Sequence, residues 1–324
     1  METPTNIARS TNRPVVGRFA PSPSGRMHLG NLYASLLAWL SVRSQGGRMV
    51  LRIEDLDPRT QSGPWADLLC EDLLWLGLDW DEGPFYQHER LSAYEDAFAV
   101  LCEAGMVYPC FCTRAELHAA SAPHASDGTP IYQGTCRRLT PEQVEERAKL
   151  RPPAMRLRVP DAQDEAGTIA YEDRTYGARE SVLARDCGDF LVRRSDGVFA
   201  YQLAVVVDDA AMGVTEVVRG SDLLDSVPRQ RYLQELLGLE HPEYAHVPLL
   251  VAPDGRRLSK RDRDCGMDGL KARFCTPERL LGHLAWLGGL ALDDAPRSAE
   301  ELAGEFSWEA VRARRDDIVI EGLV

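Results

Sequence analysis

The segment "RFAPSPSGRMHLGN", residues 18–31, most constrains the fold of this chain. It follows the apolar pair Val15-Val16 and precedes "LYASLLAWLSV", which has a clean helical period. A plain strand-to-helix connection takes about two to six residues, and this loop is longer. Gly46-Gly47 ends the helical pattern, and "RMVLRIEDLD" follows as a second strand. Strand, glycine-rich turn, helix and strand make a βαβ unit, which predicts an α/β fold with a parallel sheet.

The loop offers groups that suit a bound anion. Ser22, Ser24, Gly25, His28 and Gly30 stand at the start of the predicted helix. A helix N-terminus presents unpaired N–H groups and the positive end of its dipole, glycine lets a ligand come close, and imidazole donates to phosphate. The chain has no Gly-Lys pair, and G-x-G-x-x-G is missing after the first strand, so the two commonest nucleotide loops are excluded. The alternative is a long loop that binds no ligand, in which the hydrogen bonds of His28 are made within the protein.

A second segment, "GRRLSKRDRD" at residues 255–264, supports the phosphate interpretation. The chain has 37 cationic residues, and three of them are lysines: Lys149, Lys260 and Lys271. Lys260 nevertheless stands among four arginines in this segment, after the apolar stretch "HVPLLVAP". Such a position indicates a need for a compact ammonium on a flexible stem rather than a planar guanidinium. A solvated basic loop is the alternative.

Together the two segments resemble the signature pair of the class I aminoacyl-tRNA synthetases. "HLGN", residues 28–31, resembles the HIGH motif, with Asn31 in place of the last histidine, and "RLSKR", residues 257–261, resembles KMSKS. The finer match is to the glutamate-specific branch, through "RFAPSPSG", "RIEDLD" and "VVVDDAAMGVTEVVRGSDLL". The resemblance covers about residues 15–271. It implies a Rossmann-like parallel sheet that a zinc-bearing insertion splits, with a small, mostly helical C-terminal region.

The resemblance also implies roles for individual residues. Glutamate has two carboxylates and one ammonium, so a selective pocket needs at least two cations and one anion. His28 and Lys260 are expected to act in catalysis, with Mg²⁺ arriving on the ATP. The expected glutamate-binding residues are Arg18, Phe19, Ala20, Pro21, Ser22, Glu54, Tyr201 and Arg219, and the expected ATP-binding residues are His28, Gly30, Asn31, Ser259 and Lys260.

The expected reaction is activation of L-glutamate by ATP. The stretch "RGSDLLDSVPRQ" resembles short members of the branch that attach glutamate to the queuosine base of tRNA(Asp) rather than to a 3′ end. Full-length members carry a large further C-terminal region that reads the anticodon, and this chain stops about 60 residues after Lys260. The alternatives are a compact synthetase that charges the 3′ end of tRNA(Glu), a HIGH-type nucleotidyltransferase with a small-molecule acceptor, and a catalytically silent tRNA-binding relative.

A separate cysteine cluster indicates a structural metal site. Cys110 and Cys112 lie in "YPCFCT", and Cys136 follows in "IYQGTCRR". Three cysteines in an irregular segment suit a structural Zn²⁺, which takes four ligands. The resemblance supplies Tyr132 as the fourth, whereas generic chemistry favours His118 or His124, and three buried thiols without metal are the alternative. The other cysteines have no ligand spacing, and we expect Cys70 and Cys102 to lie in the core.

Composition limits the partners and the cellular location that the sequence predicts. The chain has 324 residues, 44% hydrophobic residues and a net charge of −13, which argues against a nucleic-acid partner unless a local basic face exists. No apolar stretch reads as a signal peptide or a membrane span, so a cytoplasmic protein with no membrane contact is expected. We also expect a monomer. Strand-like apolar texture returns in "DFLVRRSDGVFAYQLAVVVDDA". We divide the chain into a mobile tail (1–13), a catalytic first half (14–105), a zinc-bearing insertion (106–189), a catalytic second half (190–240) and a C-terminal region (241–324).

Overall fold

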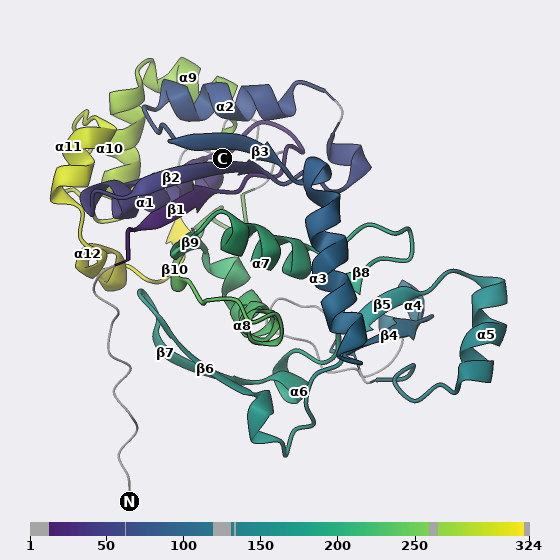
Figure 1. Cartoon of the computed structure of the whole chain (residues 1–324). Helices are drawn as coiled ribbons and strands as arrows, with labels where there is room; N and C mark the ends of the chain where they lie inside the picture. Colours follow the sequence, from purple (N-terminus) through teal and green to yellow (C-terminus); the bar gives the residue numbers. More distant parts are fainter. Residues whose placement is uncertain (1–12, 62, 119–130, 133, 259–264, 321–324) are drawn as a thin grey trace, which may run out of the picture.

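The predicted βαβ unit forms the upper part of the molecule (Figure 1). The computed structural model describes residues 13–61, 63–118, 131–132, 134–258 and 265–320, so most of the predicted tail lies outside the described residues. β2 (Arg48–Ile53) pairs in parallel with both β1 (Val16–Phe19) and β3 (Glu82–Tyr86). Between β1 and β2 runs α1 (Leu29–Ser44), whose leucines at 29, 32, 36 and 40 are fully buried. The predicted parallel sheet is therefore confirmed.

A second sheet has the order β7-β6-β10-β9. β10 (Glu243–Val247) pairs in parallel with β9 (Glu216–Gly220) and with β6 (Thr168–Asp173), and β7 (Gly177–Val182) returns antiparallel to β6. This sheet lies alongside β1, because the amide of Thr215 donates to the carbonyl of Val16 at 2.9 Å. The hairpin β6-β7 thus belongs to the same sheet as β9 and β10, which come much later in the sequence.

One segment with strand-like sequence is a helix, and that prediction was wrong. β8 (Phe190–Arg193) is a strand, but α7 (Tyr201–Ala211) contains the run "LAVVV". Leu203, Ala204, Val205 and Val206 are all buried, since α7 packs against α3 (Leu91–Glu103) and α8 (Val227–Leu236). A short apolar run does not reveal by periodicity whether it is a buried strand or a buried helix, and packing outweighs the strand preference of valine.

The cysteine-bearing segment lies at one end of the molecule, away from the last helices (Figure 1). β4 (Val107–Cys110), β5 (Ala154–Leu157) and β8 form an antiparallel sheet. The helices of this part are α4 (Arg114–His118), α5 (Pro141–Leu150) and α6 (Leu183–Asp186). Cys70 is half-buried on α2 (Trp65–Trp75), but Cys102 is exposed on α3, so its predicted core position was wrong.

The C-terminal region is mostly helical, as predicted. Its helices are α9 (Met267–Phe274), α10 (Pro277–Leu287), α11 (Ala299–Glu305) and α12 (Trp308–Ala313), and β12 (Ile318–Val319) pairs in parallel with β11 (Leu250–Val251). Short 3-10 turns are η1 (Pro58–Thr60), η2 (Gln87–Arg90), η3 (Glu165–Gly167) and η4 (Ser221–Ser226). Within the described ranges, none of the helices has the length and apolar character needed to cross a bilayer.

Candidate active site

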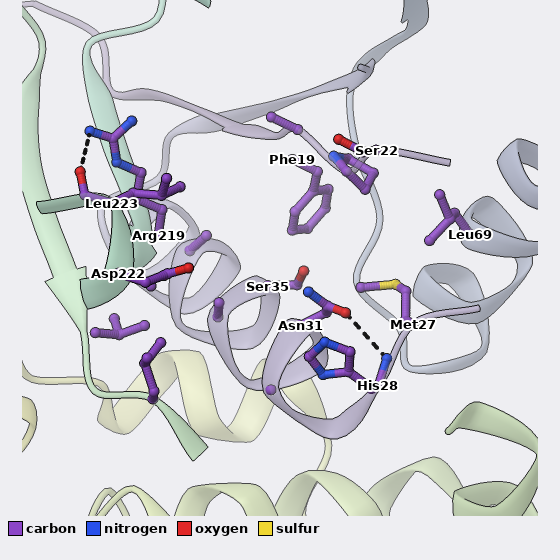
Figure 2. Close-up of a pocket in the computed structure, with 18 of the residues that line it drawn as sticks. Phe19, Ser22, Met27, His28, Asn31, Ser35, Leu69, Arg219, Asp222 and Leu223 are labelled. Atoms are coloured by element: carbon purple, nitrogen blue, oxygen red, sulfur yellow. Dashed lines mark hydrogen bonds between the residues drawn. The ribbon is translucent and has the colours of Figure 1, made fainter. Parts of the chain in front are cut away.

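One cavity gathers most of the predicted site residues. Its volume is about 640 Å³, and it opens where β1, β2 and β9 end and α1 begins (Figure 2). Parallel α/β sheets bind ligands at this edge, outside the carboxyl ends of their strands. The predicted residues that line it are Arg18, Phe19, Ala20, Pro21, Ser22, His28, Gly30, Asn31, Glu54, Tyr201 and Arg219. Ser259 and Lys260 lie outside the described residues.

The N-terminus of α1 forms one wall of the cavity. Asn31 Oδ1 accepts a hydrogen bond from the backbone N–H of His28 at 3.3 Å, as Figure 2 shows. A Cβ on Gly30 would stand 3.3 Å from both Nδ1 and Cε1 of the His28 ring, so glycine here lets the imidazole fold over the helix start. The imidazole and the backbone amides of the first helical turn therefore share one wall, an arrangement that suits phosphate oxygens.

Arg18 presents a buried guanidinium near the end of β1. The side chain is only 5% exposed, its Nη1 donates to the carbonyl of Val218 at 3.2 Å, and its Nε lies 3.7 Å from Asp209 Oδ1. Burial lowers the pKa of Arg18, and the charge of Asp209 acts in the opposite direction. A guanidinium withdrawn from water in this way gains strongly from an added carboxylate.

Glu54 stands directly after β2 and faces the same cavity. Its Oε1 accepts from Arg52 Nη2 at 3.1 Å, and its backbone N–H donates to the carbonyl of Pro21 at 2.9 Å. Burial raises the pKa of Glu54, whereas the charges of Arg52 and Arg18 act in the opposite direction. A ligand ammonium beside Glu54 would add to that opposing effect, which suits this carboxylate to binding a cation.

Arg219 reaches the cavity from β9. It is 6% exposed, its Nε donates to His246 Nε2 at 3.0 Å, and its Nη2 donates to the carbonyl of Leu223 at 3.2 Å (Figure 2). Arg18 and Arg219 both lie near the carboxyl ends of parallel strands, as predicted. Tyr201, the first residue of α7, lines the cavity and is 37% exposed.

The basic segment after β11 reaches the cavity at its start. Arg257 and Leu258 line the cavity, and Arg257 Nη1 lies 3.1 Å from Asp222 Oδ2. Asp222 belongs to η4, which follows β9 directly. An ion pair between η4 and the segment after β11 therefore anchors this end of the basic loop at the cavity.

The three predicted cysteines come together. Their sulfurs lie within 4.8 Å of one another, with Cys112 and Cys136 3.7 Å apart. Two thiolates about 2.3 Å from a tetrahedral metal lie roughly 3.8 Å apart, which matches this spacing. The Tyr132 hydroxyl lies 3.5 Å from Cys110 Sγ and 3.7 Å from Cys112 Sγ. The three thiols could hold a metal ion.

Arg156 supports this cluster from one side. Its Nε donates to Cys110 Sγ at 3.3 Å, and its guanidinium carbon lies 3.9 Å from the centre of the Tyr132 ring. A cation so placed favours the thiolate form of cysteine. Burial raises the pKa of Cys110, but the hydrogen bonds from Tyr132 and Arg156 outweigh it, so the net shift is downward. The side chain of His118 and the whole of His124 lie outside the described residues.

The sequence interpretation missed the buried charges behind the cavity. Arg52 is fully buried, and it contacts Asp209 at 2.7 Å and Asp208 at 3.7 Å. His246 and Asp173 form a second buried pair behind Arg219. A signal was present, because charged residues interrupt the apolar runs "MVLRIED" and "VVVDDA". Such charges inside a core require partners, but the sequence does not name them.

The matched family defines the class of protein. Residues 14–300 match the model described as "tRNA synthetases class I (E and Q), catalytic domain". Since this covers most of the chain, the chain belongs to that family. It is therefore an enzyme of the aminoacyl-tRNA synthetase kind, a ligase, with the class I fold of mixed helices and parallel strands.

Individual members of the family are similar to this chain over most of its length. The glutamyl-Q tRNA(Asp) synthetase of Symbiobacterium thermophilum is 50% identical over 303 residues, which are 90% of this chain and 91% of that protein. The protein of the same name from Nitratidesulfovibrio vulgaris is 46% identical over 308 residues, covering 92% and 94%. A crystal structure of a glutamate tRNA ligase from Elizabethkingia meningosepticum in complex with its amino acid is 25% identical, with a TM-score of 0.78 and coverage of 95% and 67%.

Proposed function

We propose that this enzyme activates L-glutamate with ATP and transfers it to the queuosine base of tRNA(Asp). The observation that carries the proposal is the single cavity in which Arg18, Glu54, Arg219 and the His28 end of α1 meet. Support for the acceptor comes from the names of the two relatives that match nearly end to end. In the first step a glutamate carboxylate oxygen attacks the α-phosphorus of ATP and pyrophosphate leaves. In the second, a hydroxyl of queuosine attacks the acyl carbon and AMP leaves.

The amino-acid half of the cavity has a charge that suits glutamate. The charged residues of this half that line the cavity are Arg18 and Arg219, which are positive, and Glu54, which is negative. A bound glutamate offers the complementary groups, two carboxylates and one ammonium. We assign the carboxylates to Arg18 and Arg219 and the ammonium to Glu54. The backbone of Phe19, Ala20 and Pro21 and the hydroxyls of Ser22 and Tyr201 complete this half.

The phosphate half lies at the start of α1. We assign the triphosphate to His28, Gly30 and Asn31, with Mg²⁺ bound to its oxygens. Ser259 and Lys260 would approach from the basic segment, whose described end at Leu258 borders the cavity. The ammonium of Lys260 would then neutralise charge that develops on the phosphates in the transition state.

The cysteine cluster is proposed to hold one structural Zn²⁺. Cys110, Cys112 and Cys136 would bind as thiolates and Tyr132 as the fourth ligand, a choice that the short distances from its hydroxyl to two of the sulfurs support. A structural zinc would fold the irregular chain around β4 and α4 by fixing its ligands in space. We assign residues 106–189 to this inserted unit, between the catalytic halves 14–105 and 190–240.

A second candidate is a glutamate–tRNA ligase that charges the 3′ end of tRNA(Glu). The glutamate–tRNA ligase 2 of Alkalilimnicola ehrlichii is 43% identical over 88% of this chain, and this chain covers 59% of that protein. The two candidates share the activation step and differ in the acceptor. The test must therefore vary the tRNA.

The deciding experiment supplies ATP, labelled glutamate and one of three tRNAs: tRNA(Asp) with queuosine, tRNA(Asp) from cells that cannot make queuosine, and tRNA(Glu). Label is expected only on the first. Glutamate-dependent exchange between ATP and pyrophosphate is expected without any tRNA. Equal labelling of both forms of tRNA(Asp), or labelling of tRNA(Glu), would overturn the proposed acceptor.

A further inference from the structure

His246 lies on a strand between two others, and its side chain contacts a residue of each, one of which lines the cavity. It lies on β10 and is fully buried, between Asp173 on β6 and Arg219 on β9. Its Nδ1 lies 2.6 Å from Asp173 Oδ2, and its Nε2 lies 3.0 Å from Arg219 Nε. Three buried polar side chains, joined by hydrogen bonds, therefore link the hairpin β6-β7 to a guanidinium that lines the cavity.

The partners of His246 fix its tautomer. A guanidinium can only donate, so His246 Nε2 accepts in its hydrogen bond with Arg219. The ring also has a hydrogen bond to the backbone of Leu223, which favours its protonated form and acts against this arrangement. The proton of the neutral ring is then on Nδ1, which donates to the Asp173 carboxylate. A doubly protonated ring would point an N–H at the N–H of Arg219, and the two positive charges would repel each other.

Asp173 is itself held in place. Its Oδ1 accepts from the backbone N–H groups of Thr175 and Tyr176, each at 3.0 Å, and its Oδ2 accepts from the backbone N–H of His246 at 3.1 Å. The carboxylate is 1% exposed, so these bonds are not shared with solvent. Asp173 can therefore orient the imidazole with little freedom of its own.

The contacts of Arg219 within the protein occupy two of the three nitrogens of its guanidinium. Nε is bound by His246 and Nη2 by the carbonyl of Leu223, and the ring of Tyr244 lies 5.6 Å from the guanidinium carbon. Nη1 has no hydrogen-bond partner within the part of the chain that the structure describes. A guanidinium fixed in this way binds a carboxylate without first losing the rotamer freedom of a long side chain.

We propose that His246 and Asp173 are positioning residues that hold Arg219 ready for a carboxylate of the substrate, so that the hairpin β6-β7 contributes to amino-acid recognition. This inference rests on the proposed function and adds to it two residues that touch no substrate. Removing the hydrogen bond between His246 and Arg219 is expected to weaken glutamate binding and to leave ATP binding nearly unchanged, because we assign the triphosphate to the start of α1 rather than to Arg219.

Two substitutions separate positioning from simple packing. His246→Asn keeps an N–H donor near Nδ1 for Asp173 but provides no acceptor near Arg219, whereas His246→Gln brings a carbonyl oxygen to the region of Nε2. In ATP–pyrophosphate exchange, His246→Asn is expected to raise the KM for glutamate roughly tenfold or more, the size typical of losing a charge-assisted hydrogen bond. His246→Gln should recover most of that loss, and the KM for ATP should stay within about threefold in both variants.

His241→Asn is the matched control, because that histidine is bonded to Gln234 at 2.9 Å and does not line the cavity. Equal KM values for glutamate in His246→Asn and the parent, or the same loss in His246→Gln as in His246→Asn, would overturn the positioning role. A parent that exchanges with an amino acid other than glutamate would instead refute the proposed function. Nitrogen NMR of the unsubstituted protein gives a readout without activity: a proton on Nε2 of His246 would overturn the inference in either case.

Discussion

Arg52 Nη2 donates to Glu54 Oε1 at 3.1 Å, across a strand end where neither side chain is more than 9% exposed. The same guanidinium donates through Nη1 to Asp209, which lies 3.7 Å from Arg18. Positive and negative groups therefore alternate in the order Arg18, Asp209, Arg52 and Glu54, of which the first and the last line the cavity. Each charge in this row depends on its neighbours, because little solvent reaches it.

The first prediction concerns this row. Arg52→Lys keeps the charge but loses the planar fork that spans Glu54 and Asp209. We expect a lower melting temperature and a higher KM for glutamate, and Arg52→Met should destabilise the fold by about 3–5 kcal/mol because it leaves buried carboxylates unpaired. Chemical unfolding and exchange kinetics measure the two effects. Arg59→Lys is the control, since Arg59 pairs with Asp57 at the surface, and an Arg52→Lys protein like the parent would contradict the prediction.

The second prediction concerns the cysteine cluster. Protein prepared without chelator should contain about one zinc ion per chain, as a single four-ligand site requires. Cys110→Ser should lose the metal and loosen the inserted unit, while Cys102→Ser should keep it because Cys102 is an exposed residue outside the cluster. Metal analysis measures both. Full zinc in Tyr132→Phe together with its loss in His118→Ala would reassign the fourth ligand, and no zinc in the parent would refute the site.

The third prediction concerns Lys260, whose role is inferred from the sequence alone. Lys260→Arg should lower kcat by about 100-fold while changing the KM for glutamate little, because a bulkier planar cation misplaces a contact made in the transition state. Lys149→Arg is the control, since Lys149 forms an exposed ion pair with Glu145 on α5. A kcat for Lys260→Arg near that of the parent would mean that the scarcity of lysine carries no functional meaning.

The fourth prediction concerns stability and pH. Burial and the charge of Arg219 lower the pKa of His246 to about 4 from an ordinary value of 6.5, although Asp173 opposes them. Between these values the unfolded chain binds a proton that the folded protein does not, so this histidine makes stability fall as the pH falls from 6.5 to 4.

The expected size is up to about 1.4 kcal/mol per pH unit. Denaturant unfolding at pH 7 and pH 5 should therefore show a larger loss of stability for the parent than for His246→Gln, which has no titrating group at this position. A difference between the two proteins that does not change with pH would mean that His246 keeps an ordinary pKa.

Sequence patterns were sufficient for the local elements around the cavity. The apolar pair before the loop, the period of residues 29–42 and the glycines at 46 and 47 predicted β1, α1 and β2. The structure has β1 and α1 within two residues of the prediction, whereas β2 begins at Arg48 as predicted but ends at Ile53, before the predicted carboxylates. The cysteine spacing likewise indicated a cluster, which the fold assembles. These features are readable because hydrogen bonding within a helix or turn, and the burial of one face, depend on residues close together in the chain.

The tertiary structure decided what the sequence left open. Whether "LAVVV" is a strand or a helix depended on the packing of α7 against α3 and α8, because a short, almost entirely buried apolar run has no diagnostic period. Arg52 and Arg219 each have a partner more than 25 positions away in the sequence, Asp209 and His246 respectively. A sequence can indicate that a buried charge needs a partner, but only the folded chain brings that partner within hydrogen-bonding distance.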